Sequence, residues 1–345
     1  MKPHSYPLLA DDSTAAHAPI PTATVIPSAV PMGMPAPQTM ARSIVSSVAQ
    51  APGLVLRERI YLSQLLCKAC EKRTSFAIGG WTGAPGHLDD TQITDSLQAA
   101  WLGEVREDSD CLCRYCCHQN RETKLGYFLP EQLGTVGGTF VEGGLAGYGW
   151  PEGALPELTF DRPFRCTLCC CCCLFNPQEM GVALGSNPLG RSVMECHPFP
   201  CCRCNPTFYS VRDAQETAVY HVRVPLACDD GCRNCCAPTC CNPTFIAPVL
   251  HPGSNEEVGS IENHWAGCNV RGVCFAGEAN NNYVVKVRRP RPRTVASRVV
   301  SPRLTHPAIP MRQFPAGATM EHKLLLLGST HLLDFNFFER RANQN

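Results

Sequence analysis

Hydrophobic and polar residues alternate along this chain in two different periods. Between residues 54 and 78, apolar side chains recur mostly at steps of three and four residues, which predicts a short helix. Farther along, short runs of alternating or β-branched residues are separated by Gly, Pro and Asn, a pattern typical of strands. Many short strands with frequent turns predict a mainly β fold, either a barrel or a sandwich. The predicted strands are Ala99–Arg106, Lys124–Leu129, Glu157–Asp161, Thr207–Val211, Thr217–Val224, Pro243–Val249, Val258–Ile261 and Tyr283–Val287.

The last periodic segment, residues 320–340, has apolar side chains around most of a helix circumference. Helices of this kind are buried in protein or in lipid. As a helix, residues 324–338 reach only about 22 Å, against a hydrocarbon core of about 30 Å. We therefore expect a helix enclosed by strands, with shallow membrane insertion or a full span as alternatives. Its candidate core or membrane-facing residues are Leu324, Leu325, Leu326, Leu327, Leu332, Leu333, Asp334, Phe335, Phe337 and Phe338.

Other segments have compositions that predict no regular structure. Residues 1–53 are rich in Pro, Ala, Thr and Ser and predict a disordered arm. Proline-rich arms dock on SH3 or WW domains, although a solvated tail is the simpler interpretation. Residues 134–153 are rich in glycine and predict a flexible loop, while residues 288–318 predict a basic, proline-rich excursion. The ordered domain is expected over residues 54–340, followed by a tail at 341–345.

The charge balance and the motifs narrow the class of function. Lys and Arg number 30 and Asp and Glu also number 30, so the formal net charge is zero. Nucleic-acid binding usually requires a basic excess, so a nucleic acid is not an expected partner. The sequence contains no Gly-x-Ser-x-Gly, Walker or His-Glu-x-x-His motif. We therefore do not expect an enzyme.

Cysteine is unusually abundant, with 24 among 345 residues. A disulfide scaffold is disfavoured because the chain is long and its first residues lack the apolar core of a signal peptide. No stretch offers about 20 apolar residues for a conventional membrane span. Lys2 follows Met1, which argues against N-myristoylation, and residues 342–345 are not a prenylation box. We expect reduced thiols, in the cytosol or on a cytosolic membrane face.

Five of these cysteines are adjacent, at Cys169, Cys170, Cys171, Cys172 and Cys173. Side chains along an extended chain alternate between two faces, so some of these thiols must reach the surface. Neighbouring side chains also point apart, which suits a tetrahedral metal site poorly. Clustered thiols are candidates for S-acylation, and two acyl chains anchor a protein stably where one does not. We favour acylation over metal binding or unmodified thiols.

Cysteine pairs with the spacing Cys-x-x-Cys offer a metal-binding alternative. Two such pairs have the spacing of zinc knuckles and could together supply four thiolates. The candidate ligands are Cys201, Cys204, Cys232 and Cys235. At this cysteine density the spacing also arises by chance, so zinc or an iron–sulfur cluster is the less favoured hypothesis.

Several short motifs follow one another in a fixed order. The series runs from Tyr61-Leu62-Ser63-Gln64 through Leu158–Cys166, then His264-Trp265-Ala266-Gly267, and ends with Leu332–Glu339. In this order the motifs resemble those of the phospholipid scramblase family. The resemblance covers roughly residues 54–287 and 320–340.

The resemblance implies a tubby-like fold, a closed antiparallel barrel of about twelve strands around a buried C-terminal helix. It also implies ATP-independent, bidirectional movement of phospholipids between leaflets, by a protein palmitoylated on the cysteine run at a cytosolic membrane face, first of all the plasma membrane. The alternatives are a lipid-anchored regulatory or phosphoinositide-binding protein without transport activity, or a cysteine-rich metal protein.

Calcium is the usual activator that the resemblance implies. The corresponding segment here offers Glu278, Asn280 and Asn281. Calcium prefers several oxygen ligands that include carboxylates, and only one of these residues is acidic. We therefore expect weak calcium binding at most, and a hairpin turn of asparagines is the alternative.

Overall fold

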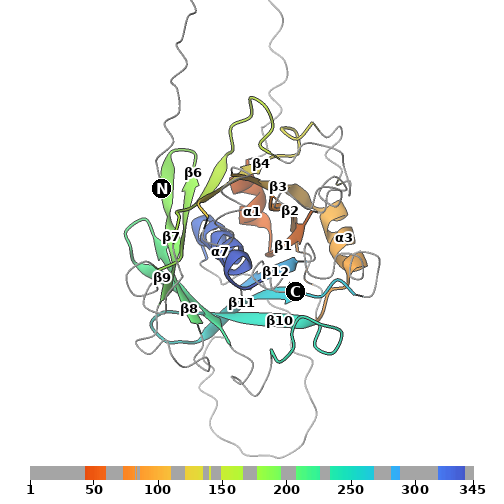
Figure 1. Ribbon diagram of the computed structural model, residues 1–345, viewed down its shortest axis with the longest axis vertical. Coiled ribbons are helices and arrows are strands. Elements are labelled where there is room, and N and C mark those ends of the chain that lie inside the picture. Colours follow the sequence, from red (N-terminus) through yellow and green to blue (C-terminus); the bar gives the residue numbers. More distant parts are fainter. Residues whose placement is uncertain are drawn as a thin grey trace, which may run out of the picture. The chain divides into compact units, whose positions relative to one another are not determined.

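The computed structural model describes residues 43–59, 73–81, 83, 86–109, 121–134, 140, 149–165, 177–195, 207–225, 234–267, 281–287 and 318–338. In this part of the chain, twelve antiparallel strands form one closed barrel (Figure 1). Each strand pairs with its neighbours in sequence, and β12 closes the barrel against β1, with Gly53 opposite Lys286. The predicted mainly β fold is confirmed, and it is consistent with a tubby-like barrel.

The strands are short and evenly connected. Each of the eight predicted strands overlaps an observed one, whereas β1, β2, β6 and β7 were not predicted. Closure leaves no strand edge open to pairing with another chain. The strands are β1 Gly53–Glu58, β2 Ser75–Gly80, β3 Trp101–Asp108, β4 Thr123–Phe128, β5 Leu158–Arg162, β6 Glu179–Leu184, β7 Asn187–Glu195, β8 Thr207–Asp213, β9 Ala218–Val224, β10 Thr244–Leu250, β11 Glu257–His264 and β12 Asn282–Val287.

The C-terminal helix α7, Met320–Leu333, lies within the ring of strands and continues into a π-helical turn, η4, Asp334–Phe338 (Figure 1). Its leucines and Phe335 are buried in the main core, while Phe337 and Phe338 are half-buried against it. The helix packs closely against β6 at Gly328, where an added Cβ would lie 2.6 Å from Val182 Cγ2. Next to it, the hydroxyls of Ser329 and Ser192 are 2.6 Å apart. The prediction of a helix enclosed by strands is therefore confirmed.

The helix predicted between residues 54 and 78 is wrong for the residues that the structure describes. Residues 53–58 form β1 and residues 75–80 form β2. Leu54 and Leu56 face the main core, whereas Val55 belongs to a second cluster on the outer face of the barrel. A strand covered on both faces is apolar at successive positions, and its sequence lacks the alternation that identifies a half-exposed strand.

The outer cluster is covered by helix α3, Asp90–Ala99, which lies outside the ring of strands (Figure 1). Asp89 and Gln92 form a capping box at its start, so the first turn is satisfied locally. Ile93 and Leu97 of the helix pack against Val55 and other residues of the cluster. This second layer explains why part of the barrel is buried on both sides.

Helix α1, Ile44–Gln50, begins at Ser43 within the segment that we expected to be a disordered arm. Ile44 and Val48 are fully buried in the main core. The ammonium group of Lys323 on α7 donates hydrogen bonds to the carbonyls of Val48, Ala49 and Ala51 at 2.8–3.1 Å. The expectation of disorder is therefore wrong for this short helix. Ile44 and Val48 lie one turn apart, and together they bury one face of the helix against the core.

Most of the remaining predicted segments lie outside the described residues. This holds for residues 1–42 of the arm, 288–317 of the basic excursion and the tail at 341–345. Within the glycine-rich segment, Phe140 is buried in the outer cluster and packs edge-on against Trp101, with ring centroids 6.0 Å apart. That position is part of the fold, and flexibility elsewhere in the segment stays a prediction.

Candidate functional site

The cysteines fall in one set of the sequence intervals between strands. All 24 fall in the sequence intervals that follow the odd-numbered strands β1, β3, β5, β7, β9 and β11, at residues 59–74, 109–122, 163–178, 196–206, 225–243 and 265–281. None falls in a strand or helix that the structure describes. Because neighbouring strands are antiparallel, these six strands all finish at the same end. We call it the cysteine end, and the end covered by α1 the α1 end.

Most of the predicted site cysteines lie outside the described residues. These are Cys169–Cys173 of the run, and Cys201, Cys204 and Cys232 of the metal alternative. Cys235 is described and exposed, together with Cys236, Cys240 and Cys241 in the same loop. Among the described residues, no group of three or more His, Cys, Asp or Glu side chains is placed to hold a metal ion. S-acylation of the run and metal binding both stay predictions.

A large aromatic side chain accompanies the thiols at this end. Phe164 directly follows β5, and 51% of its surface is exposed to solvent. Its neighbour Arg165 pairs with Glu179 at the start of β6. An exposed aromatic ring beside a cationic side chain suits the boundary between apolar and aqueous phases.

Beneath the cysteine end, the barrel interior contains buried charges. Arg121 and Glu107 are fully buried, and Arg121 Nε donates to Glu107 Oε1 at 3.0 Å. Burial alone would raise the pKa of Glu107, but the charge of Arg121 and its hydrogen bonds outweigh burial and lower that pKa. The guanidinium groups of Arg121 and Arg162 lie 5.3 and 5.1 Å from the Phe335 ring centroid. These cation–π contacts anchor η4 inside the barrel.

On the other side of the same interior, Asp334 accepts hydrogen bonds from Tyr283 Oη at 2.6 Å and Asn281 Nδ2 at 2.9 Å. Burial, followed by the charge of Asp334, raises the pKa of Tyr283 well above its usual value. Asn281 Oδ1 in turn accepts from Asn263 Nδ2 at 3.1 Å. Asn281, a predicted calcium ligand, thus uses both ends of its amide to join β11, β12 and η4. Glu278 and Asn280 lie outside the described residues, so calcium binding stays a prediction.

An ionisable cluster that the sequence analysis missed lies on the outer face of β11 and β12. Glu262 Oε2 is 2.7 Å from Lys286 Nζ and 3.2 Å from His264 Nε2. Burial alone would raise the pKa of Glu262, but His264 and Lys286 outweigh it and lower that pKa to about 2. Burial also lowers the pKa of His264, whose Nδ1 accepts from the Leu88 N–H at 3.0 Å. Glu262 and His264 are two residues apart in β11, so their side chains lie on the same face. This spacing was the sequence signal from which the cluster could have been found.

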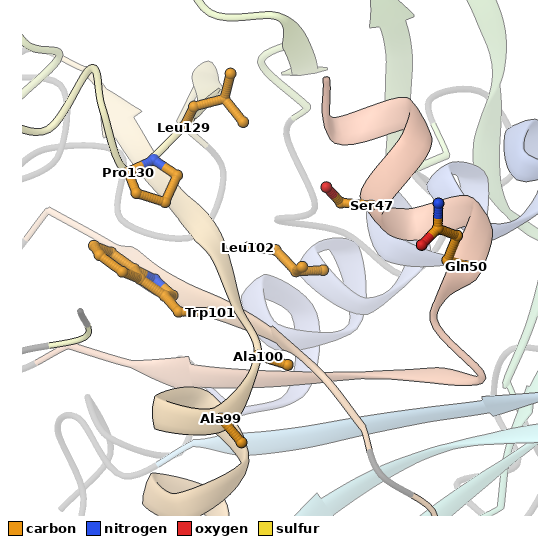
Figure 2. Close-up of a pocket in the computed structure, with 8 residues that line it drawn as sticks. All are labelled: Ser47, Gln50, Ala99, Ala100, Trp101, Leu102, Leu129 and Pro130. Atoms are coloured by element: carbon orange, nitrogen blue, oxygen red, sulfur yellow. The ribbon is translucent and has the colours of Figure 1, made fainter. Parts of the chain in front are cut away.

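A cavity of about 310 Å³ lies at the α1 end (Figure 2). Ser47 and Gln50 of α1 line one side, and Trp101, Leu129 and Pro130 lie across from them. Ser47 and Gln50 are the polar residues of its lining, the other lining residues are mainly apolar, and none of them is charged. The arrangement differs from the opposite end, where the described loop carries exposed thiols.

Comparison with known proteins supports one family. The chain is 25% identical over 241 residues to phospholipid scramblase 1 of Rattus norvegicus, a match that covers 69% of this chain. The matched region is 50% of that relative, so the chain spans about half the length of the curated protein that it matches. No family model matches the chain. No solved structure matches it.

This similarity confirms the resemblance to the phospholipid scramblase family that the ordered motifs indicated. The fold agrees with the expectation that came with the resemblance, a closed barrel around a C-terminal helix. In the part of the chain that the structure describes, no helix is both long and apolar enough to span a bilayer.

Proposed function

We propose that this chain is a scramblase-like protein that lets phospholipids move between the two leaflets of a membrane in both directions without ATP. The observation that carries the proposal is the similarity to phospholipid scramblase 1 over 69% of the chain. The sequence contains no nucleotide-binding motif, so the direction of net movement would follow the lipid gradient. The barrier to such movement is the cost of taking a polar headgroup through hydrocarbon.

The geometry supports attachment of the barrel to the membrane by its cysteine end. In this proposal, palmitoyl chains on Cys169–Cys173 hold the protein at the cytosolic face, with the plasma membrane as the expected location. Phe164 lies at the same end and adds an exposed aromatic contact. Membrane phospholipids are then the main partner, and SH3 or WW domains are proposed partners of the proline-rich segment before α1.

Calcium enters the proposal only as a weak activator. Glu278 and Asn280 would supply oxygen ligands together with Asn281 Oδ1, which accepts a hydrogen bond from Asn263 Nδ2. An ion that displaced this hydrogen bond would be coupled to η4, because the same amide donates to Asp334 through its nitrogen. Because a single carboxylate belongs to the set, we expect an effect only at millimolar calcium.

A lipid-anchored regulator without transport activity is the second candidate, and one observation favours it. Leu324–Leu327 of α7 are completely buried inside the barrel. In this conformation, these leucines contact strands rather than lipid, so the most hydrophobic segment of the chain does not itself perturb a bilayer. A phosphoinositide headgroup would be the ligand of such a regulator.

Reconstitution separates the two candidates. The full chain is placed in liposomes that carry a fluorescent phospholipid in both leaflets, and dithionite bleaches the outer label. Protein-free vesicles lose about half the fluorescence, because half the label is in the outer leaflet, and scrambling would drive the loss well beyond half, with a modest further gain at millimolar calcium.

A matched control is the Gly328→Leu variant, in which the helix no longer fits against Val182. No leaflet exchange, with or without calcium, would remove the transport claim. Co-sedimentation of the wild type with phosphoinositide vesicles would then support the regulatory alternative.

A further inference from the structure

The loop between β9 and β10 carries two adjacent cysteine pairs in its described part, residues 234–243. Cys235, Cys236, Cys240 and Cys241 are all exposed. The two sulfur atoms lie 3.8 Å apart in the first pair and 3.9 Å apart in the second. We call these four residues the thiol platform.

The platform stands on a loop that hydrogen bonds and burial hold in place. The side-chain amide of Asn234 forms two hydrogen bonds with the backbone of Ile246 in β10. It donates to the Ile246 carbonyl at 2.8 Å and accepts from the Ile246 N–H at 2.9 Å. Asn242 Nδ2 donates to the Cys235 carbonyl at 3.0 Å. Ala237, between the two pairs, is 1% exposed and belongs to the main core. The backbone is therefore fixed against the barrel while the thiols point outward.

Neither core packing nor a disulfide bond within either pair accounts for the platform. Exposed side chains do not contribute to core packing. Sulfur separations of 3.8 and 3.9 Å are far from the bonded distance of about 2.05 Å. The described residues contain no cluster of three or more metal-ligating side chains that could hold an ion, and a metal site that joins Cys235 to Cys232 stays a prediction. Four exposed thiols on a fixed loop are suited to covalent modification.

The position of the platform indicates which modification. It lies at the cysteine end, the same end as Phe164 and as the strands that flank the run Cys169–Cys173. A thioester-linked chain on the platform would therefore enter the same apolar phase as chains on the run. Two attachment points on different sides of the barrel rim, after β5 and after β9, would fix the tilt of the barrel, which one point leaves free.

We propose that the thiol platform is a second S-acylation site of this protein. The proposal rests on the membrane attachment described under the proposed function. The acyl donor is a long-chain acyl-coenzyme A. A platform thiolate attacks the thioester carbonyl, the new sulfur–carbon bond forms as the coenzyme A thiolate leaves, and that thiolate takes up the proton that the cysteine released.

The pairing of the thiols bears on which member reacts. The hydrogen bond with Cys240, together with the charge of Cys240, raises the pKa of the Cys241 thiol. Cys241 therefore keeps its proton to a higher pH than an isolated cysteine does, and thiolates rather than thiols are the nucleophiles. We therefore expect Cys241 to be acylated more slowly than an isolated cysteine.

Acyl exchange on the full chain from eukaryotic cells tests the proposal. Hydroxylamine cleaves thioesters, and a maleimide–polyethylene glycol tag then adds a countable mass to each freed thiol. Four proteins are compared: the wild type, a run variant with Cys169–Cys173 changed to Ser, a platform variant with its four cysteines changed to Ser, and the combined variant. Thr239→Ser in the same loop is the matched control, because it leaves every thiol in place.

We expect the run variant to keep at least one hydroxylamine-dependent tag, and the combined variant to lose it. Loss of every tag in the run variant would overturn the platform proposal and leave the proposed anchor intact. If the platform variant alone loses its tags while the run variant loses none, the platform holds and the anchor at the run fails. Absence of tags from the wild type would overturn both. Maleimide labelling of unacylated bacterial protein, read against Thr239→Ser, establishes that the platform thiols are accessible.

Discussion

The two ends of this barrel differ in what fills the interior and in what is exposed outside it. At the α1 end, a short apolar helix covers the interior and Lys323 holds its last carbonyls by three hydrogen bonds. At the cysteine end, the interior holds the buried pair of Glu107 and Arg121 and the hydrogen bonds of Asp334, while the exposed loop carries thiols. The α1 end is closed by a packed helix, whereas the cysteine end combines a fixed polar interior with exposed thiols outside it.

If the proposed attachment holds, stability and function are carried by separate layers of one barrel end. Residues just inside the cysteine end fix η4 and the strand ends. The exposed thiols just outside it contribute little to packing, and we propose that they serve attachment. The predictions below test this division by perturbing each layer in turn, starting with the interior.

The largest effect is expected from breaking the buried ion pair of the cysteine end. Arg121→Met leaves Glu107 buried without its guanidinium partner, and we expect a loss of about 3–5 kcal/mol in the free energy of unfolding. Denaturant unfolding of the purified chain measures it. Glu107→Gln in the Arg121→Met background should restore part of the loss, since it removes the uncompensated charge. Equal stability of Arg121→Met and wild type would show that this pair does not hold the interior.

A similar but smaller loss is expected at the α1 end. Ile44→Ala removes a fully buried side chain and should cost about 2–4 kcal/mol. Ser46→Ala is the matched control, because Ser46 lies on the exposed side of the same helix. If Ile44→Ala unfolds like Ser46→Ala in a denaturant titration, α1 is not part of the cooperative unit and the comparison of two structured ends fails.

Much of the fold could be predicted from the sequence, and the misses have physical causes. Alternation identified strands such as β9, with Tyr220, Val222 and Val224 facing inward. β1 was mistaken for helix because both of its faces are buried. β7 contains Pro188 and Gly190, which are unfavourable in strands, and Gly190 adopts φ 144° where an added Cβ would meet the Arg212 carbonyl at 2.1 Å.

The candidate site was predicted less completely, because its parts converge only through strand pairing. The cysteine run is visible as a sequence motif, but nothing local shows that all six cysteine-bearing intervals follow strands that finish at one end. Likewise, Asn281 was predicted to be a calcium ligand because its segment corresponds to the one that binds calcium in the family that the chain resembles. Its contact with Asp334, 53 positions away, follows from the docking of η4.

Acid should lower the free energy of unfolding by disrupting the ionisable cluster on the outer face of β11 and β12. The pKa of Glu262 is about 2 in the folded chain against 4.5 as its usual value, so the stabilisation by Lys286 and His264 is present above pH 4.5 and is lost as the pH falls toward 2. His264 also has a lowered pKa, so it resists protonation in the fold and its own contribution declines below pH 6.5. We expect about 1–2 kcal/mol less stability at pH 4 than at pH 7. Glu262→Gln should flatten the profile between pH 4.5 and 2; an unchanged profile would mean that other carboxylates dominate.

The smallest effect on stability is expected where we propose the largest effect on attachment. Changing Cys235, Cys236, Cys240 and Cys241 to Ser alters only exposed side chains, so the free energy of unfolding should change by less than about 0.5 kcal/mol per site. Membrane fractionation should nevertheless show a larger soluble fraction when these changes are combined with serines at Cys169–Cys173 than with the latter alone, since fewer acyl chains remain. A strongly destabilised platform variant would place these thiols in the packing of the barrel rather than on its reactive surface.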